Sequence, residues 1–163
     1  MFSIFKKKEE KKQEKTLVAF ATGRVIPIEE VPDPVFAEKT LGGGVAIEPE
    51  ENVITSPCDG TVTVVMEESK HAVGIVSLDG MELLIHEGLE TVGMQGEGFE
   101  LFVKVGQEVK KGDRLIEFNP QKVRERGCST MCILAISNED NFSGLEYICG
   151  MTAVQGNTAI VKY

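Results

Sequence analysis

The stretch that decides the fold is residues 71–86, HAVGIVSLDGMELLIH, in which two apolar runs flank an Asp-Gly dipeptide. Such a dipeptide between two β-prone runs is typical of a β-hairpin with a two-residue loop. With Asp79 and Gly80 as that loop, His71 and His86 project from the same face as diagonal neighbours. The sequence therefore predicts two antiparallel strands that bring the two histidines of the chain close together.

The two faces of the predicted hairpin differ in their expected surroundings. In this register His86 lies opposite Val73. The histidine face carries Val73, Ile75 and Leu84, so it is more apolar than a plain solvated face and could seat a partner protein. The other face is expected to pack in the core, and it carries Ala72, Val76, Leu78, Met81, Leu83 and Ile85.

Outside the hairpin, the chain from Thr16 onward is a series of short Val-, Ile- and Leu-rich segments separated by Gly, Pro, Asp and Asn. Turn signals at this density leave no room for long helices, and short strands at such spacing are typical of antiparallel sandwiches or barrels. The predicted fold is all-β, a compact antiparallel β-sandwich/barrel-like hybrid of short strands. A few single-turn helices are expected near residues 34–39, 120–126 and 138–145.

Charge divides the chain into two parts. Residues 1–15 carry six lysines and three glutamates, a net charge of +3, whereas the whole chain has a formal net charge of −9. We interpret residues 1–15 as a charged flexible tail and residues 16–163 as one domain with a net charge of −12. An acidic domain argues against nucleic acid as its partner, because phosphate backbones select basic surfaces. It favours a partner with a basic contact surface.

Cysteine spacing and the first residues indicate the compartment. Only two of the four cysteines are close in sequence, with no second matching pair, so we expect free, buried thiols at Cys58, Cys128, Cys132 and Cys149. At the N-terminus a short apolar part precedes the lysines, the reverse of a secretory signal. We therefore predict a cytoplasmic protein. Residues 1–8 could add a peripheral contact with anionic lipid at the inner face of the membrane.

Three interpretations of His71 and His86 are open at this point: two ordinary histidines, a metal site or a phosphoryl-transfer site. Two imidazoles alone leave a zinc ion short of ligands, and no HxH or HExxH spacing supplies more. In phosphoryl transfer, one neutral imidazole attacks phosphorus while the N–H of the other stabilises charge on the phosphoryl oxygens. The sequence has no GxxxxGK[ST] loop to cradle a nucleotide, which argues against an ATP-dependent kinase.

Several segments, in order along the chain, resemble the glucose-family IIA domains of the bacterial phosphoenolpyruvate-dependent sugar phosphotransferase system. The resemblance covers about residues 17–163. The segments that carry it are VPDPVFAEK (31–39), GVAIEP (44–49), SPCDGT (56–61), residues 71–88, TV (91–92), GEGF (96–99) and VKVGQEVKKGD (103–113).

The resemblance implies a phosphotransferase component that requires no nucleotide and no other cofactor. In that family a histidine accepts a phosphoryl group from the carrier protein HPr and passes it to a cysteine on the IIB domain of a sugar permease, here of glucose type. By position, His86 is the phosphorylated nucleophile and His71 the stabiliser of the phosphoryl group. Ser69, where the family usually has threonine, would hydrogen-bond a histidine ring. The family also implies regulatory binding when unphosphorylated, in some cases with zinc between His71, His86 and a partner carboxylate.

The resemblance also implies a shallow apolar docking surface. Its positions in this chain are Val35, Phe36, Leu84 and Ile85. Leu84 and Glu87 replace bulkier apolar or aromatic neighbours of His86, so the local packing and the partner preference are expected to depart from the family pattern.

Two alternatives from other classes fit less well. Residues 56–64 and 103–115 resemble the half-motifs of biotinyl or lipoyl carrier domains, but such a carrier needs a lysine at a hairpin tip. The predicted tip here is Asp79 and Gly80. A zinc peptidase on a related β scaffold would need a third metal ligand and a placed general base, and the sequence indicates neither.

Overall fold

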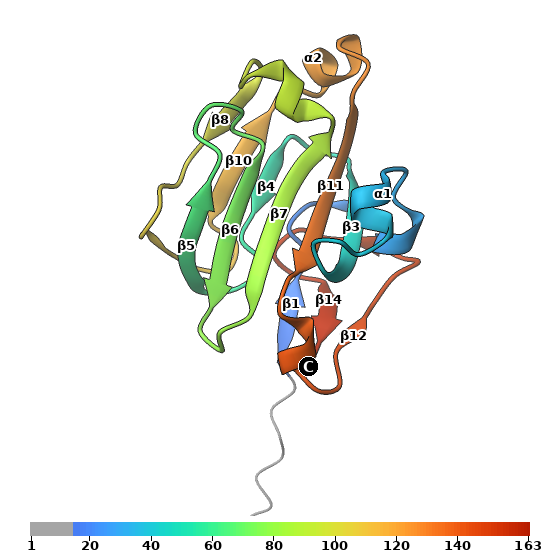
Figure 1. Ribbon diagram of the computed structural model, residues 1–163, viewed down its shortest axis with the longest axis vertical. Helices are drawn as coiled ribbons and strands as arrows, with labels where there is room; N and C mark the ends of the chain where they lie inside the picture. The colour runs from blue at the N-terminus through green and yellow to red at the C-terminus, as the bar shows by residue number, and fades with distance from the viewer. Residues whose placement is uncertain (1–14) are drawn as a thin grey trace, which may run out of the picture.

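The main element of the fold is an eight-stranded antiparallel sheet, seen in a computed structural model that describes residues 15–163 (Figure 1). Its strands are rich in Val and Ile, which suit a pleated and half-buried surface. In their order across the sheet, they are β13 (Thr152–Ala153), β2 (Gly23–Pro27), β3 (Gly43–Pro49), β11 (Ser129–Ile136), β7 (Glu82–Leu89), β6 (Ala72–Ser77), β5 (Gly60–Val65) and β9 (Glu108–Val109).

Two smaller antiparallel sheets complete the β structure of the described residues. One contains β1 (Thr16–Val18), β14 (Ala159–Lys162) and β12 (Glu146–Tyr147); the other contains β4 (Val53–Thr55), β10 (Arg114–Phe118) and β8 (Phe99–Leu101). Buried side chains from β4, β8 and β10 share one core cluster with those of β6 and β7. The large sheet has free edges at β13 and β9, so no barrel closes among the described residues, and the predicted antiparallel β-sandwich is confirmed.

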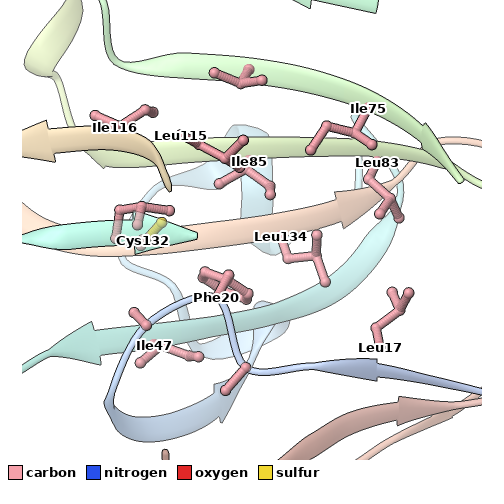
Figure 2. Packing of buried hydrophobic residues seen from close by; sticks show 14 of the residues in the cluster. Leu17, Phe20, Ile47, Ile75, Leu83, Ile85, Leu115, Ile116, Cys132 and Leu134 are labelled. Carbon is pink, nitrogen blue, oxygen red and sulfur yellow. The ribbon is translucent and has the colours of Figure 1, made fainter. Parts of the chain in front are cut away.

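The core lies on one face of the large sheet. Ile85 of β7, Leu134 of β11, and Leu115 and Ile116 of β10 belong to one buried cluster, in which Figure 2 shows Leu115 next to Ile85. A second, smaller cluster lies on the opposite face and includes Phe36, Ala46 and Ile133. The large sheet therefore buries apolar side chains on both faces near β3, β11 and β7.

The helices are short, as predicted. They are α1 (Pro34–Ala37), α2 (Pro120–Glu125) and the single 3₁₀ turns η1 (Ile28–Glu30), η2 (Thr91–Met94) and η3 (Glu139–Asn141). Asp33 caps α1 by accepting a 2.9 Å hydrogen bond from the backbone N–H of Val35, and a proline occupies the first turn, where its missing N–H costs nothing. Helical turns thus form in all three predicted regions.

The register of the β6–β7 hairpin differs by one residue from the prediction. The loop contains three residues, Leu78 to Gly80, so Ala72 rather than Val73 lies opposite His86. The hydroxyl of Ser77 accepts the N–H of Met81 at 3.0 Å, and the two backbones also pair there. This side-chain bond closes the wider loop, and Gly80 takes the positive φ of 83° that such loops need.

A one-residue shift exchanges the two faces of a strand, and the predicted faces of β6 were therefore wrong. Val73 and Ile75 are fully buried in the main core, together with the correctly predicted Met81, Leu83 and Ile85 of the opposing segment. Ala72 and Val76 lie on the histidine face instead. Leu78, predicted to be in the core, is 81% exposed at the loop.

The N-terminal boundary of the fold lies at or before Lys15. Lys15 and Tyr163 exchange two backbone hydrogen bonds, of 3.1 and 2.9 Å, and the Lys15 ammonium contacts Asp79 at 2.8 Å. The rest of the predicted tail of residues 1–15, including residues 1–8 and their expected lipid contact, lies outside the described residues. Within residues 15–163, no helix is long and apolar enough to span a membrane.

All four cysteines are free, as predicted. Cys132 is buried, as expected, but the expected burial was wrong for Cys58, Cys128 and Cys149, which are only partly buried. Burial raises the pKa of the Cys58 thiol to about 12, so this sulfur stays protonated and unreactive near neutral pH.

Candidate functional site

The two histidines form a contacting pair at one end of the hairpin. His86 lies in β7, and His71 immediately precedes β6, where its carbonyl accepts the N–H of Glu87 at 2.7 Å. The ring centroids lie 4.5 Å apart, with the planes at 86°. The predicted approach of the rings is therefore confirmed, although the register that produces it is not the predicted one.

The rings differ in how much solvent reaches them. His71 is buried, with 3% of its surface exposed, whereas His86 is partly exposed. The Nδ1 atom of His86 is buried and has no hydrogen-bond partner among the described residues. The Nε2 atom is therefore the ring nitrogen of His86 that remains for chemistry at the surface.

The environment keeps both rings neutral. Burial, and then the proximity of His71, lowers the pKa of His86 to about 4, against a smaller opposing effect from the backbone of Gly88 and the carboxylate of Asp33. Burial also lowers the pKa of His71. A neutral imidazole keeps one unprotonated nitrogen, which is the state that a nucleophilic ring needs.

Ser69 holds the His71 ring. Its hydroxyl lies 2.6 Å from Nδ1 of His71, and both side chains are buried. Lys70, between them, adopts the left-handed backbone conformation with φ of 56°, which turns the chain so that residues two apart can meet. When the hydroxyl donates to Nδ1, the single proton of neutral His71 sits on Nε2, where it can be donated. The sequence-predicted contact between Ser69 and a histidine ring is therefore present.

The predicted docking residues separate into two groups. Val35 is 46% exposed, and Leu84 is half-buried on the histidine face. Phe36 is buried, and its ring packs edge-on against His86 with centroids 4.9 Å apart. Ile85 points to the other face and is fully buried in the main core, so its assignment to the docking surface was wrong. Adjacent strand residues point to opposite faces, so Leu84 and Ile85 could not both line that surface.

A hollow beside Ser69 was missed by the sequence reasoning. Its volume is about 880 Å³, and its lining residues are Val65, Met66, Glu67, Glu68, Ser69, Val92 and Gln95. Met66 is 46% exposed and Val92 61% exposed. The hollow joins segments about 25 residues apart in sequence, so no local pattern reveals it. It adds apolar and acidic side chains to the surface beside the histidines.

Metal binding by the pair alone has little support. Among residues 15–163, no group of three or more His, Cys, Asp or Glu side chains is placed to hold a metal ion. Structural zinc sites need four ligands, and catalytic ones keep three from the protein. Any zinc at His71 and His86 would need further ligands from another molecule.

Glu87 is the least expected feature near the site. It follows His86 on β7 but points into the core, where it is fully buried opposite Cys132 of β11. Figure 2 shows Cys132 among the apolar side chains of that core. The Cys132 thiol faces the carboxyl, yet neither carboxyl oxygen has a hydrogen bond of good geometry. Burial raises the pKa of the Glu87 carboxyl well above its usual value.

We expect Glu87→Met to stabilise the protein by roughly 2 kcal/mol at pH 7, because it removes a buried carboxyl without hydrogen bonds and keeps the volume. The raised pKa means that the folded chain keeps a proton that the unfolded chain releases. Wild-type stability should therefore fall as pH rises above about 4.5, the ordinary carboxyl pKa. The measurement is urea unfolding at pH 5 and pH 8.

Glu48→Met is the matched control, because Glu48 is an exposed glutamate on β3. It should leave both the stability and its pH dependence close to those of wild type. A Glu87→Met protein that unfolds more easily than wild type at pH 8 would contradict the expectation.

Comparison with known proteins places the chain in a family. Residues 15–142 match the model of the family described as phosphoenolpyruvate-dependent sugar phosphotransferase system, EIIA 1. The chain is 49% identical over 152 residues to the PTS system glucose-specific EIIA component of Bacillus anthracis, covering 93% of this chain and 92% of that protein. It is 42% identical over 160 residues to the protein of that name from Oceanobacillus iheyensis, covering 98% and 96%.

A solved structure agrees with these sequence relatives. The glucose permease IIA from Mycoplasma capricolum superposes with a TM-score of 0.83 at 34% identity, covering 92% of this chain and 96% of that one. Sequence and structure therefore match over nearly the whole described chain, and the range matched by the family model spans positions 71 and 86. The chain belongs to the EIIA 1 family of the phosphoenolpyruvate-dependent sugar phosphotransferase system and is a phosphotransferase component that carries phosphoryl groups during sugar uptake.

Proposed function

We propose that His86 accepts a phosphoryl group from a phosphohistidine of HPr and passes it to a cysteine on the IIB domain of a glucose-type permease. The observation that carries this assignment is the contact between two neutral rings, of which only His86 is partly exposed. The names of the relatives, which specify glucose, support the choice of sugar.

The transfer step at His86 needs only an unprotonated Nε2. Its lone pair forms a new N–P bond while the N–P bond of the donor phosphohistidine breaks, and that bonding pair returns to the donor ring. The low pKa of His86 keeps its ring neutral, and attack through Nε2 uses the tautomer whose single proton is on the buried Nδ1. Onward transfer reverses the roles, with the cysteine sulfur attacking phosphorus and the N–P pair returning to His86.

His71 stabilises the phosphoryl group. With Nδ1 held by the Ser69 hydroxyl, its Nε2–H can be donated to a phosphoryl oxygen. Such a donor acts where charge is spread over the equatorial oxygens in the transition state, and burial strengthens its effect. Positioning and one donor are enough for an exchange between two rings of similar chemistry, so we infer no required metal or other cofactor.

The surface around the pair supports docking of a partner with an apolar centre and a basic rim. The exposed Val35 precedes Phe36, whose ring packs against His86, and Leu84 lies on the histidine face of β7. Met66 and Val92 line the hollow beside Ser69. Glu67 and Glu68 border that hollow, and the domain as a whole is acidic. HPr and the IIB domain would therefore share one contact surface and bind in turn.

Regulatory binding of the unphosphorylated form is a second proposed role. Phosphorylation adds roughly two negative charges, which changes what the apolar surface can bind. Zinc at His71 and His86 would need at least a carboxylate from that partner, because residues 15–163 supply no third ligand. We place these exchanges in the cytoplasm, with residues 1–8 as a peripheral contact at the inner face of the membrane.

The test is intact mass of the protein after incubation with phosphoenolpyruvate, enzyme I and HPr. We expect one phosphoryl increment that is lost in acid, as phosphohistidine is, and that is discharged when a IIB domain is added. Omission of HPr is the control and should leave the mass unchanged. No increment with a demonstrably active HPr would overturn the proposal.

A further inference from the structure

The backbone of Glu87 lies between the two histidines and is held from both sides. Its N–H donates to the carbonyl of His71 at 2.7 Å, and its carbonyl accepts the hydroxyl of Thr91 at 2.6 Å. The Thr91 side chain is fully buried. The backbone that directly follows His86 is therefore held in place by the Thr91 hydroxyl as well as by the hydrogen bonds of the sheet.

The methyl group of Thr91 also acts on this backbone. Gly88 has φ of 80°, and a Cβ atom on it would lie 2.3 Å from Cγ2 of Thr91 and 2.8 Å from the carbonyl oxygen of Ser129. Thr91 thus occupies the space that a side chain at position 88 would need. Hydroxyl and methyl together hold residues 87 and 88, which directly follow His86 in β7, in one conformation.

The turn that carries Thr91 has a strained backbone. Glu90 and Gln95, which bracket η2, both adopt the left-handed conformation although neither is glycine, with φ of 63° and 54°. Backbone strain of this kind is held only where the surroundings impose it, and it clusters at functional sites. Lys70, between Ser69 and His71, is strained in the same way.

The same turn region reaches the loop that holds the other histidine. Gly96 approaches that loop so closely that a Cβ atom on it would lie 2.5 Å from the carbonyl oxygen of Glu68, next to Ser69. Residues 91–96 therefore contact both segments that carry the site. Thr91 contacts the strand of His86, and Gly96 contacts the loop of Ser69. A rigid turn at this place can set the position of one ring relative to the other.

We propose that Thr91 is a positioning residue for phosphoryl transfer: through the Glu87 carbonyl and the Gly88 backbone, it fixes the His86 ring against His71. This inference rests on the proposed roles of the two histidines. Thr91 touches neither ring by any hydrogen bond and supplies no group to the phosphoryl oxygens. Its effect is geometric, and in-line transfer is sensitive to displacements of the reacting nitrogen of about 1 Å.

The experiment compares Thr91→Val, Thr91→Ser and Ser56→Ala in the full-length protein. Thr91→Val keeps the shape and removes the hydroxyl, while Thr91→Ser keeps the hydroxyl. Ser56→Ala is the matched control, because the fully buried Ser56 donates a hydroxyl to the carbonyl of Cys58 at 2.7 Å, a bond of the same kind in another part of the chain. Each variant is measured for rate of phosphoryl uptake from phospho-HPr, for unfolding by urea and for imidazole ¹⁵N shifts.

We expect Thr91→Val to take up the phosphoryl group about tenfold more slowly, and its His86 ¹⁵N shifts to move. Thr91→Ser should recover most of the rate. Ser56→Ala should lose comparable stability, with unchanged rate and histidine shifts. A merely structural role of Thr91 would lower stability without moving the shifts.

The outcomes separate this inference from the proposed function. If wild type is phosphorylated and Thr91→Val matches it in rate and in ¹⁵N shifts, the positioning role is wrong and the carrier function stands. If wild type is not phosphorylated, the proposed function fails, and the ¹⁵N shifts of Thr91→Val alone decide whether Thr91 positions the pair. Equal effects of Thr91→Val and Ser56→Ala on the shifts would also overturn the inference.

Discussion

Replacing His86 with alanine is expected to abolish phosphoryl uptake from phospho-HPr completely. His86 is the partly exposed member of the pair, and its low pKa of about 4 keeps the ring neutral at physiological pH. His71 cannot take over, because it is 3% exposed and its Nδ1 is held by Ser69. The measurement is intact mass after incubation with phosphoenolpyruvate, enzyme I and HPr.

The fold should survive this change, so loss of uptake can be assigned to chemistry. His86 lies on the outer face of β7, while the main core is built from the other face. Circular dichroism and urea unfolding of His86→Ala provide the control. An acid-labile phosphoryl group on His86→Ala would show that another side chain is the acceptor.

Replacing His71 with alanine is expected to separate uptake from onward transfer. The variant keeps the His86 nucleophile, so it should still gain one phosphoryl group when given enough time. It lacks the buried N–H that we assign to the phosphoryl oxygens, and loss of one such donor typically slows a reaction by about 10²- to 10³-fold. We expect a slowing of this order in single-turnover transfer from the phosphorylated protein to a IIB domain.

His71→Gln is the informative companion variant. Its amide can donate one hydrogen bond from a place near that of the ring nitrogen, so transfer should recover in part. Ser69→Ala should lie between wild type and His71→Ala, because the ring stays but loses the hydroxyl that fixes its tautomer. Transfer by His71→Ala at the wild-type rate would rule out the stabilising role.

The hairpin shows which structural features the local sequence pattern can predict and which it cannot. The two apolar runs that flank Asp79 and Gly80 predicted two paired strands, and the structure contains them. The loop length was set by the Ser77 hydroxyl, which accepts the N–H of Met81 and admits a third loop residue. A side-chain hydrogen bond of this kind competes with the tendency of an Asp-Gly dipeptide to form a two-residue loop. The register is therefore shifted by one residue from the predicted one, which places Val73 and Ile75 in the core.

The two histidine rings meet although the predicted register was wrong, and the reason is geometric. His71 precedes β6 and bends away from it after the left-handed Lys70, so its ring meets His86 in the observed register as well. The family resemblance pointed to Ser69, and the contact it makes is local, between residues two apart. The burial of Glu87 was not predicted, because carboxyl side chains are rarely buried, yet the strand period places this one on the core face.

Taken alone, the sequence determined the all-β class, the short helical turns, the acidic domain and the close approach of the two histidines. These properties depend on residue type and on contacts within a few residues, where propensity and spacing act directly. The tertiary structure decided which ring is exposed, how Phe36 and Thr91 are placed around it, and which neighbours of His86 face the core. Those depend on packing between segments far apart in the chain, and packing is settled only when the whole sheet is assembled.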